Sequence, residues 1–378
     1  MADCPAGKPR TADLAQCLAF NLSIAETTAL RLRLLGGGWE PTVELASTLR
    51  LLPALAMAVS AKGLAAGLPA LHYASGEVTP AAALADALPA HDQRRSTLRQ
   101  RAAEVIDYLA AADIYPVLLK GARAIWTGTP AWRSLRDIDL LVPAPQTSAA
   151  VSIAIANGYR PNDLFDAPKN WHHGAELYRD DLPGWLEIHE RGGVRRMEVI
   201  LSTEQLVAAA VPITTTPGGN EVLVLPAPLH VLHCLMHHHI GHRGDYDGVI
   251  DFKGLYEFAA DVDVLDEAGR EALLRAASQH PRLMAMFDLW LAAAADVFRL
   301  NIRRPLRLAD DARRYWTAAR TRAGQGTTPS RFTGLPCELS MAVVATRLRR
   351  QPHGATHLGR LRLRYNAIRS IATRAVGE

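Results

Sequence analysis

The sequence predicts an α+β fold in which a mixed β-sheet core, residues 113–226, is flanked by helical regions at residues 1–112 and 227–378. Two observations support this prediction. Leucine and alanine are dense in the flanking regions, and strand-like alternation is hard to find there. Between them, short apolar runs end at glycine or proline, as buried strands do. A length of 378 residues accommodates two or three structural units.

The N-terminal region is expected to consist of helices. Gly36, Gly37 and Gly38, followed by Pro41, predict a break in it. The stretch 79–90 reads as a helix or a loop that lines the core. A longer helix is predicted at 92–111, because its apolar positions recur at helical spacing; they are Leu98, Ala102, Val105, Ile106 and Leu109.

The core is expected to alternate strands with short helices. Apolar runs predict strands at 114–121 and 136–144, and a strand or the start of a helix at 221–226. Turn residues between HGAELYRD and GWLEIHER predict an antiparallel hairpin at 173–191. A short helix is predicted at 122–128. Another is predicted at 147–159, with its first threonine as the cap and a glycine at its exit.

Composition excludes several classes of protein. An apolar content of 49% argues against a largely disordered chain. The net charge of +4 suits an anionic substrate such as a nucleotide but is small for a nucleic-acid groove. The four cysteines form no CxxC pair, so neither a disulfide framework nor a zinc ribbon is expected. No apolar stretch reaches the ~18–20 residues of a membrane span, and the N-terminus lacks a signal-peptide layout. We therefore expect a soluble, cytoplasmic protein without membrane contact.

Paired carboxylates mark the candidate metal site. Asp137 and Asp139 are two residues apart on a predicted strand, so both side chains share one face. Adjacent carboxylates repel unless a cation lies between them, and Mg²⁺ is commonly shared by carboxylates and substrate phosphates. In WLEIH, Glu187 could complete the group if the two strands are neighbours. Three converging carboxylates can hold two metal ions. Glu176, on the other strand of the hairpin, is the main competitor of Glu187.

Upstream residues have the chemistry of a phosphate site. Lys120, Gly121 and Ala122 lie where a strand meets a helix, so that backbone N–H groups and the helix N-terminus could face a phosphate. Lys120 could neutralise a phosphate directly. Arg133 and Arg136 flank the aspartates and could do the same in bidentate fashion, although ion pairing at the surface is an alternative for both.

The stretch LLKGARAIWTGTPAWRSLRDIDLLV resembles the signature of the DNA polymerase β-type nucleotidyltransferase superfamily, in which glycine and then glycine or serine precede Asp-apolar-Asp-apolar. Two departures are Ala122, where the superfamily has glycine or serine, and a rather long spacer before the aspartates. The chain is more similar to the family of uncharacterised nucleotidyltransferases. That likeness covers about residues 115–255 and rests on KGA, Arg133, DIDLLV, EIH and a histidine-rich helix followed by an aspartate, which is taken as Asp251.

The resemblance implies metal-binding roles for Asp137, Asp139 and Glu187, and nucleotide-phosphate contacts around Gly121 with Lys120. The predicted nucleotide-binding set is Lys120, Gly121, Ala122 and Arg133, within a minimal nucleotidyltransferase core. The cofactors expected are Mg²⁺ or Mn²⁺, with an NTP, ATP being favoured, as co-substrate.

The predicted reaction moves an NMP from the NTP to a hydroxyl or phosphate acceptor and releases pyrophosphate. A small molecule or a peptide-derived metabolite is the favoured acceptor, ahead of tRNA, another nucleic acid or a protein. One alternative is a nucleotide-binding antitoxin or regulatory module with the same fold.

Histidines supply a second alternative. His233 and His237, like His238 and His242, are four residues apart, a spacing that can present two imidazoles to one metal. A histidine-based metal hydrolase is therefore an alternative, although the cluster lacks the glutamate of HExxH, and core or wall positions for these residues are favoured. His189 is a substrate contact, a base or a structural residue. The arginine-rich tail, 347–373, is expected to be a solvated helix face rather than an RNA-binding surface.

Overall fold

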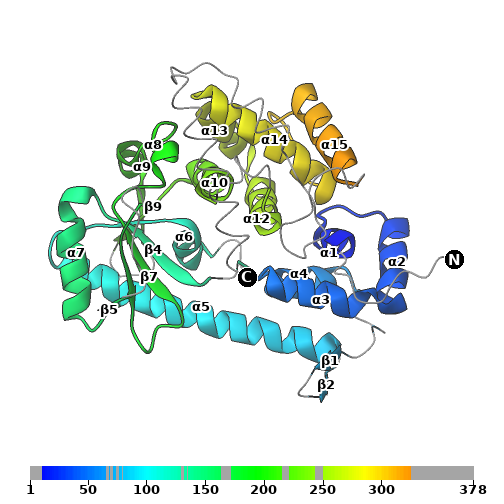
Figure 1. The fold of residues 1–378 in the computed structure, drawn as a ribbon, viewed down its shortest axis with the longest axis horizontal. Coiled ribbons are helices and arrows are strands. Elements are labelled where there is room, and N and C mark those ends of the chain that lie inside the picture. Colours follow the sequence, from blue (N-terminus) through cyan, green and yellow to red (C-terminus); the bar gives the residue numbers. More distant parts are fainter. Residues whose placement is uncertain are drawn as a thin grey trace, which may run out of the picture.

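A computed structural model describes residues 11–64, 68, 71–73, 76–78, 80–128, 132–133, 135–162, 172–214, 221–242 and 250–324. The sequence prediction for 347–373 lies outside these residues. The predicted α+β class is confirmed, since a seven-stranded mixed sheet is surrounded by helices (Figure 1). None of the helices in the described ranges is both long and apolar enough to cross a membrane.

The first helices form a compact layer at the N-terminal side. They are α1 (Thr11–Leu18), α2 (Ile24–Arg33), the π-helical turn η1 (Leu34–Gly38), α3 (Trp39–Thr48) and α4 (Leu52–Ala61). Ser23 and Glu26 start α2 with a reciprocal capping box. The predicted glycine break is confirmed: Gly37 has a φ of 94°, and the backbone kinks there between α2 and α3.

A long helix, α5 (Pro80–Ala110), connects this layer with the sheet and runs along the lower edge of Figure 1. The apolar face predicted for 92–111 is confirmed, because all five of its named residues are buried against the sheet. A small antiparallel hairpin, β1 (Leu71–Tyr73) and β2 (Gly76–Val78), precedes the helix. The sequence-based expectation of an all-helical N-terminal region missed this hairpin, whose strands have only three residues each.

The sheet has the strand order β5-β6-β7-β4-β3-β9-β8. Its strands are β3 (Val117–Leu118), β4 (Asp137–Leu141), β5 (Arg160–Pro161), β6 (His173–Tyr178), β7 (Trp185–His189), β8 (Val211–Thr214) and β9 (Glu221–Val224). β6 and β7 pair antiparallel, which confirms the predicted hairpin, and β9 is a strand that pairs parallel with β3. β4 and β7 lie side by side and parallel, at the centre of the sheet.

Two helices beside the sheet begin earlier than predicted. The helices of the core are α6 (Lys120–Thr127), α7 (Ala144–Ala156), α8 (Arg195–Glu198) and α9 (Thr203–Ala209). Thr147 is not the cap of α7, because the preceding residues Pro143 and Pro145 preset the first turn and start the helix three residues sooner. The Thr147 hydroxyl donates instead to the carbonyl of Val142, at 3.0 Å. Gly158, with a φ of 89°, does follow the helix exit as predicted.

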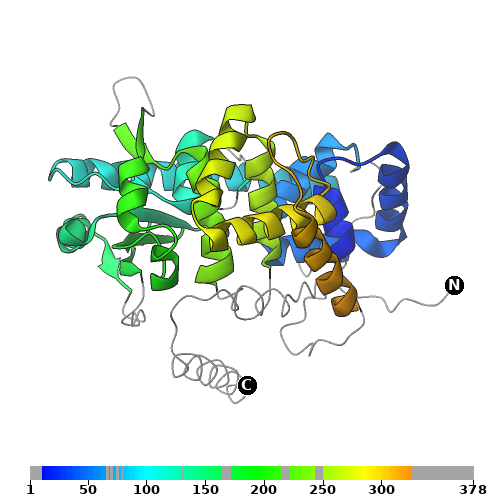
Figure 2. The ribbon, with the colours of Figure 1, turned by 90° about the horizontal axis from the view of Figure 1, so that it is seen from above.

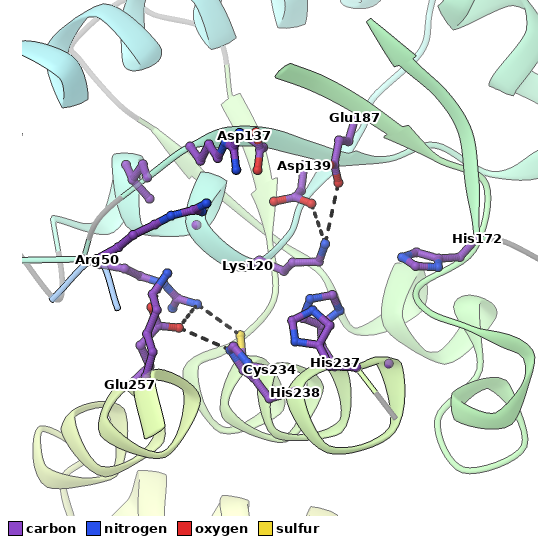
Figure 3. Close-up of a pocket in the computed structure, with 17 residues that line it drawn as sticks. Arg50, Lys120, Asp137, Asp139, His172, Glu187, Cys234, His237, His238 and Glu257 are labelled. Carbon is purple, nitrogen blue, oxygen red and sulfur yellow. Dashed lines mark hydrogen bonds and ion pairs between the residues drawn. The ribbon is translucent and has the colours of Figure 1, made fainter. Parts of the chain in front are cut away.

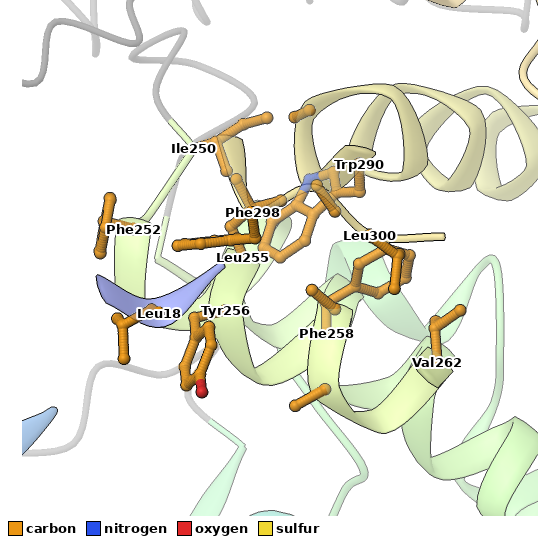
Figure 4. Packing of buried hydrophobic residues seen from close by; sticks show 14 of the residues in the cluster. Leu18, Ile250, Phe252, Leu255, Tyr256, Phe258, Val262, Trp290, Phe298 and Leu300 are labelled. Atoms are coloured by element: carbon orange, nitrogen blue, oxygen red, sulfur yellow. The ribbon is translucent and has the colours of Figure 1, made fainter. Parts of the chain in front are cut away.

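The C-terminal helices lie between the sheet and the N-terminal layer (Figure 2). They are α10 (Ala227–Met236), the π-helical turn η2 (His237–Gly241), α12 (Phe252–Asp263), α13 (Glu267–Ser278), α14 (Pro281–Val297) and α15 (Asp310–Gly324). Leu18 of α1 shares one apolar cluster with Tyr256 of α12 and Trp290 of α14 (Figure 4). The N- and C-terminal helices thus bury their apolar faces against each other. The boundaries at 112/113 and 226/227 stay predictions.

Candidate functional site

The parallel pairing of β4 with β7 places three acidic residues on one face of the sheet. In this register Asp139 is opposite Glu187, and Asp137 is opposite Trp185. Ile138 and Leu186 alternate with them and are fully buried on the other face. The apolar face fixes the register, because a shift by one residue would bury the carboxylates. The expected neighbourhood of Glu187 and the aspartates is therefore present.

A tight group of metal-ligating side chains occupies this face. Donor atoms of Asp139, Glu187 and His189 all lie within 4.8 Å of one another, and within the described ranges this is the group of three that could hold a metal ion. His189 Nε2 lies 3.0 Å from Asp139 Oδ1 and 3.2 Å from Glu187 Oε2. Asp137 and Glu176 are outside the group. Glu176 is nevertheless opposite Glu187 in the β6–β7 pairing.

Lys120 neutralises part of this acidic group. It is the first residue of α6 and has a φ of 43°, a left-handed conformation that is uncommon outside glycine. Its Nζ lies 2.6 Å from Asp139 Oδ1 and 3.8 Å from Glu187 Oε2 (Figure 3). Burial opposes the ammonium charge, but the two carboxylates outweigh it and raise the pKa of Lys120. Burial is likewise outweighed at Asp139, where Lys120 and His189 hold the carboxyl pKa well below its usual value.

The carboxyl pKa of Asp137 shifts in the opposite direction to that of Asp139. Burial and the charges of Glu187 and Asp139 raise the pKa of Asp137 to about 7, against a weaker effect of Arg136. Its Oδ1 is buried and has no hydrogen-bond partner among the described residues. A buried carboxylate oxygen without a partner is costly. A cation beside Asp137 would supply the missing partner and relieve the repulsion, so the residues present fit a divalent metal.

The KGA segment is held tightly under this group. Gly121 lines the adjoining cavity, and a Cβ at this position would lie 2.7 Å from Leu135 Cδ2. A Cβ at this position would force the Leu135 side chain to shift, so packing against the residues before β4 favours glycine here, in addition to any role at a phosphate. Ala122 is fully buried in the sheet core, so a phosphate could reach only its backbone.

Arg133 is an internal ion-pairing residue. Its side chain is buried and lies 2.9 Å from Glu257 Oε2 and 3.8 Å from Asp261 Oδ2, both on α12. It also contacts His230 and Cys234 of α10. Burial opposes its charge, but the acidic partners raise the pKa of the guanidinium further. The donor groups of Arg133 thus already serve internal partners. The nucleotide contact expected of Arg133 stays a prediction.

A cavity of about 330 Å³ joins these elements. Besides residues of the sheet and α6, its walls contain Arg50 from the loop after α3, His172 before β6, and Lys253 of α12. The sequence analysis did not find these three. Arg50 and Lys253 carry no local motif, and only packing of the three segments brings them to the sheet. His172 precedes the predicted hairpin, but no spacing signal marks it.

The histidine-rich helix forms one wall of the cavity. His233 Nε2 lies 2.6 Å from the Gly192 carbonyl oxygen, so this histidine is bonded within the core. His237, His238 and His242 pack ring against ring, with centroids 4.6–5.6 Å apart. In the part of the chain that the structure describes, none of these histidines belongs to a group of three metal-ligating donors. His237, His238 and His242 thus line the cavity, and the alternative of a histidine metal centre stays a hypothesis.

Asp251 connects this wall with α12. It is the N-cap of the helix and accepts a hydrogen bond of 2.7 Å from the Gly254 N–H. His238 Nδ1 lies 3.2 Å from Asp251 Oδ2, and its Nε2 lies 3.5 Å from Glu257 Oε2. The aspartate that follows the histidine-rich helix thus supports the cavity wall.

Comparison with family models gave a match to the uncharacterised nucleotidyltransferases over residues 36–299, well over half of the chain. The match confirms the resemblance found in the sequence and extends it on both sides, into the helical regions. Comparison with curated proteins gave no match.

Proposed function

The chain belongs to the uncharacterised nucleotidyltransferase family, and we propose on this basis that it is an active, metal-dependent enzyme. It transfers an NMP from an NTP, with ATP favoured, to a hydroxyl or phosphate acceptor and releases pyrophosphate. One observation carries the proposal. Asp139 and Glu187 lie side by side on parallel strands, next to the buried Asp137 oxygen for which the described residues supply no hydrogen-bond partner.

The metal ligands proposed are Asp137, Asp139 and Glu187, and His189 is added because its Nε2 is within reach of the same oxygens. Carboxylate oxygens suit Mg²⁺ and Mn²⁺, and an imidazole beside them favours Mn²⁺ over the harder Mg²⁺. When bound, such a metal neutralises charge on the transferring phosphoryl group and lowers the pKa of an attacking hydroxyl.

Side chains around the metal ligands position the nucleotide. Lys120 and the backbone of Gly121 and Ala122 lie where α6 begins, and the N–H groups and positive end of that helix favour a phosphate. Arg136 directly precedes the aspartates and is exposed at the cavity. Arg133 is proposed to act chiefly by holding the residues before β4 against α12. Phosphoryl transfer depends mainly on such positioning and charge neutralisation.

The first test measures ATP binding by isothermal titration with and without Mg²⁺. Metal-dependent binding that is lost in Asp139→Asn supports the site. Glu176→Gln is the matched control, because it removes a carboxylate from the neighbouring strand position outside the ligand group. Absence of metal-dependent binding would contradict the proposal.

The second test measures transfer. The protein is incubated with each α-labelled NTP, Mg²⁺ and a cell extract, and labelled products are separated. Label should enter a new species and disappear with Asp139→Asn; label that persists in this variant would refute the site. Metal-dependent binding without transfer to any species would favour the nucleotide-binding regulatory module instead.

A further inference from the structure

The cavity has two chemically different sides. Arg50 and Asp137 lie on one side of Lys120, and His172 lies on the other (Figure 3). Asp139 and Glu187 lie between these sides, above Lys120. The metal-ligand group therefore separates two sides of the cavity. We call them the arginine side, formed by Arg50 and by Arg136, which directly precedes Asp137, and the imidazole side.

The arginine side has the charge and freedom to bind a polyphosphate. Arg50 and Arg136 are exposed, and neither forms an ion pair within the described ranges. Arg50 also has a φ of 57°, the left-handed conformation that commonly ends a helix, and the Leu51 N–H donates to the Ala46 carbonyl at 2.7 Å to close this turn after α3. Guanidinium groups match the geometry of phosphate oxygens. This side suits the leaving pyrophosphate.

The imidazole side consists of His172, His237 and His242. His172 is buried and its ring faces that of His189, with centroids 5.0 Å apart. His237 lies edge-on to both other histidines, with centroid distances of 6.5 Å to His172 and 4.6 Å to His242. Exposure rises from buried His172 through half-buried His237 to exposed His242. The three rings thus lead from solvent toward the carboxylates.

The cationic groups near these rings are already matched by acids. Lys253 Nζ lies 3.6 Å from Glu257 Oε1, and His238 is paired with Asp251 and Glu257. Burial, together with Lys120 and the other imidazoles, lowers the pKa of His237 well below its usual value, so this ring is neutral. Neutral imidazoles donate and accept hydrogen bonds, as hydroxyl groups do. Among the described residues that line the cavity here, the cations are paired with carboxylates. A phosphorylated ligand would therefore be less well neutralised here than beside Arg50 and Arg136.

The attacking and leaving oxygens of phosphoryl transfer lie roughly in line on opposite sides of the phosphorus. Given the proposed function, on which this inference rests, the geometry points to His172, His237 and His242 as the acceptor subsite. Its ligand is a neutral compound with a free hydroxyl, such as a polyol, a sugar or an alcohol side chain, rather than a phosphorylated acceptor. The acceptor oxygen bonds to the α-phosphorus, its proton passes to Glu187, and the bond to the β-phosphate oxygen breaks as pyrophosphate leaves with the electron pair.

The test measures pyrophosphate release by the full-length protein with ATP and Mn²⁺. Glycerol, glucose and N-acetylserine amide are compared with their phosphorylated counterparts at equal concentration. At least one neutral compound should accelerate release over the rate in water, and its phosphorylated counterpart should not. Acceleration by the phosphorylated compounds only, or by none of the six, would overturn the inference.

Two variants locate the subsite. His237→Phe should raise the KM of the accelerating compound about tenfold, the effect of one lost hydrogen bond, and change the KM of ATP less than twofold. Arg50→Met should instead raise the KM of ATP and change the KM of the accelerating compound less than twofold. His237→Gln, which retains hydrogen bonding, should recover part of the acceptor KM, and thermal melting checks that each variant is folded. A His237→Phe variant that alters the KM of ATP and spares the acceptor would contradict the assignment.

The outcomes separate the two proposals. If the wild-type protein shows no metal-dependent ATP binding, both the proposed function and this inference are refuted. Metal-dependent binding with slow release into water, but without any preference between neutral and phosphorylated compounds, would refute the acceptor subsite alone.

Discussion

Replacement of Lys120 by methionine tests how the acidic group is balanced. Lys120 Nζ lies 2.6 Å from Asp139 Oδ1 and 3.8 Å from Glu187 Oε2. Lys120→Met keeps the length of the side chain and removes its charge. We predict that the metal-free protein becomes less stable, while the divalent metal binds more tightly, because the metal and the ammonium group compete for the same carboxylate oxygens.

The distances give the magnitude. At an effective dielectric constant of about 20, the two attractions are about 6 and about 4 kcal/mol. Desolvation of the charges offsets much of this, and removing one partner of a buried ion pair costs about 3–5 kcal/mol. The side chain of Lys120 is 14% exposed at the cavity, so we expect the lower end, about 3 kcal/mol. A part of this ~3 kcal/mol should be recovered when a metal binds, so Lys120→Met should bind the metal about tenfold more tightly than the wild type, or more.

Chemical denaturation with EDTA or with saturating Mn²⁺ measures both effects. Lys120→Met should lower the unfolding free energy in EDTA, and Mn²⁺ should restore more of it than in the wild type. Lys253→Met is the control: it also removes a lysine from the cavity wall, but one paired with Glu257 rather than with the metal ligands. Unchanged stability in EDTA, or a smaller gain from Mn²⁺ than in the wild type, would refute the reasoning.

Three further predictions concern other parts of the site. Burial opposes the charge on His238, but its hydrogen bonds to Asp251 and Glu257 raise its pKa. The stability that the charged His238 contributes is therefore complete below the pKa of the unfolded state and is lost as the pH rises through the pKa of the folded state. The difference in unfolding free energy between wild type and His238→Gln should narrow from pH 6 to pH 9, and a constant difference would contradict this. His189→Ala should weaken Mn²⁺ binding more than Mg²⁺ binding in titrations, because imidazole favours Mn²⁺ over the harder ion; equal losses would argue against ligation. Gly121→Ala should cost about 1–3 kcal/mol, since its methyl would overlap a buried leucine 2.7 Å away, and an unchanged melting temperature would contradict the packing argument.

The central part of the site was predictable from local pattern. Alternation in RDIDLLV and WLEIH fixed which side chains share a face, and turn residues indicated the hairpin that carries Glu187. The parallel pairing of β4 with β7 was not predicted, but once the strands are neighbours, the apolar residues on the opposite face leave one favourable register. Local pattern thus predicted the carboxylates together with the elements that hold them.

The remaining contributors could not be found in this way, because their roles depend on contacts between distant segments. Arg133 looks like a phosphate ligand in the sequence, yet α12 brings Glu257 to within 2.9 Å of it. Arg50 lies in a loop with no motif and reaches the cavity only when the N-terminal helices pack. Thr147 shows a local error, since the prolines before it outweighed its propensity to cap a helix.

The contacts of Arg133 also connect the sheet core with the C-terminal helices. Arg133 lies a few residues before Asp137, and its buried charge is balanced by Glu257 and Asp261 of α12. α12 in turn packs with α1 and α14 in one apolar cluster. Loss of the helices would remove both acidic partners of Arg133 and would loosen the segment that leads into the aspartates. Since the helices also supply Arg50 and the imidazole wall, they support the segment before the aspartates and at the same time form the cavity walls that we propose to contact substrates.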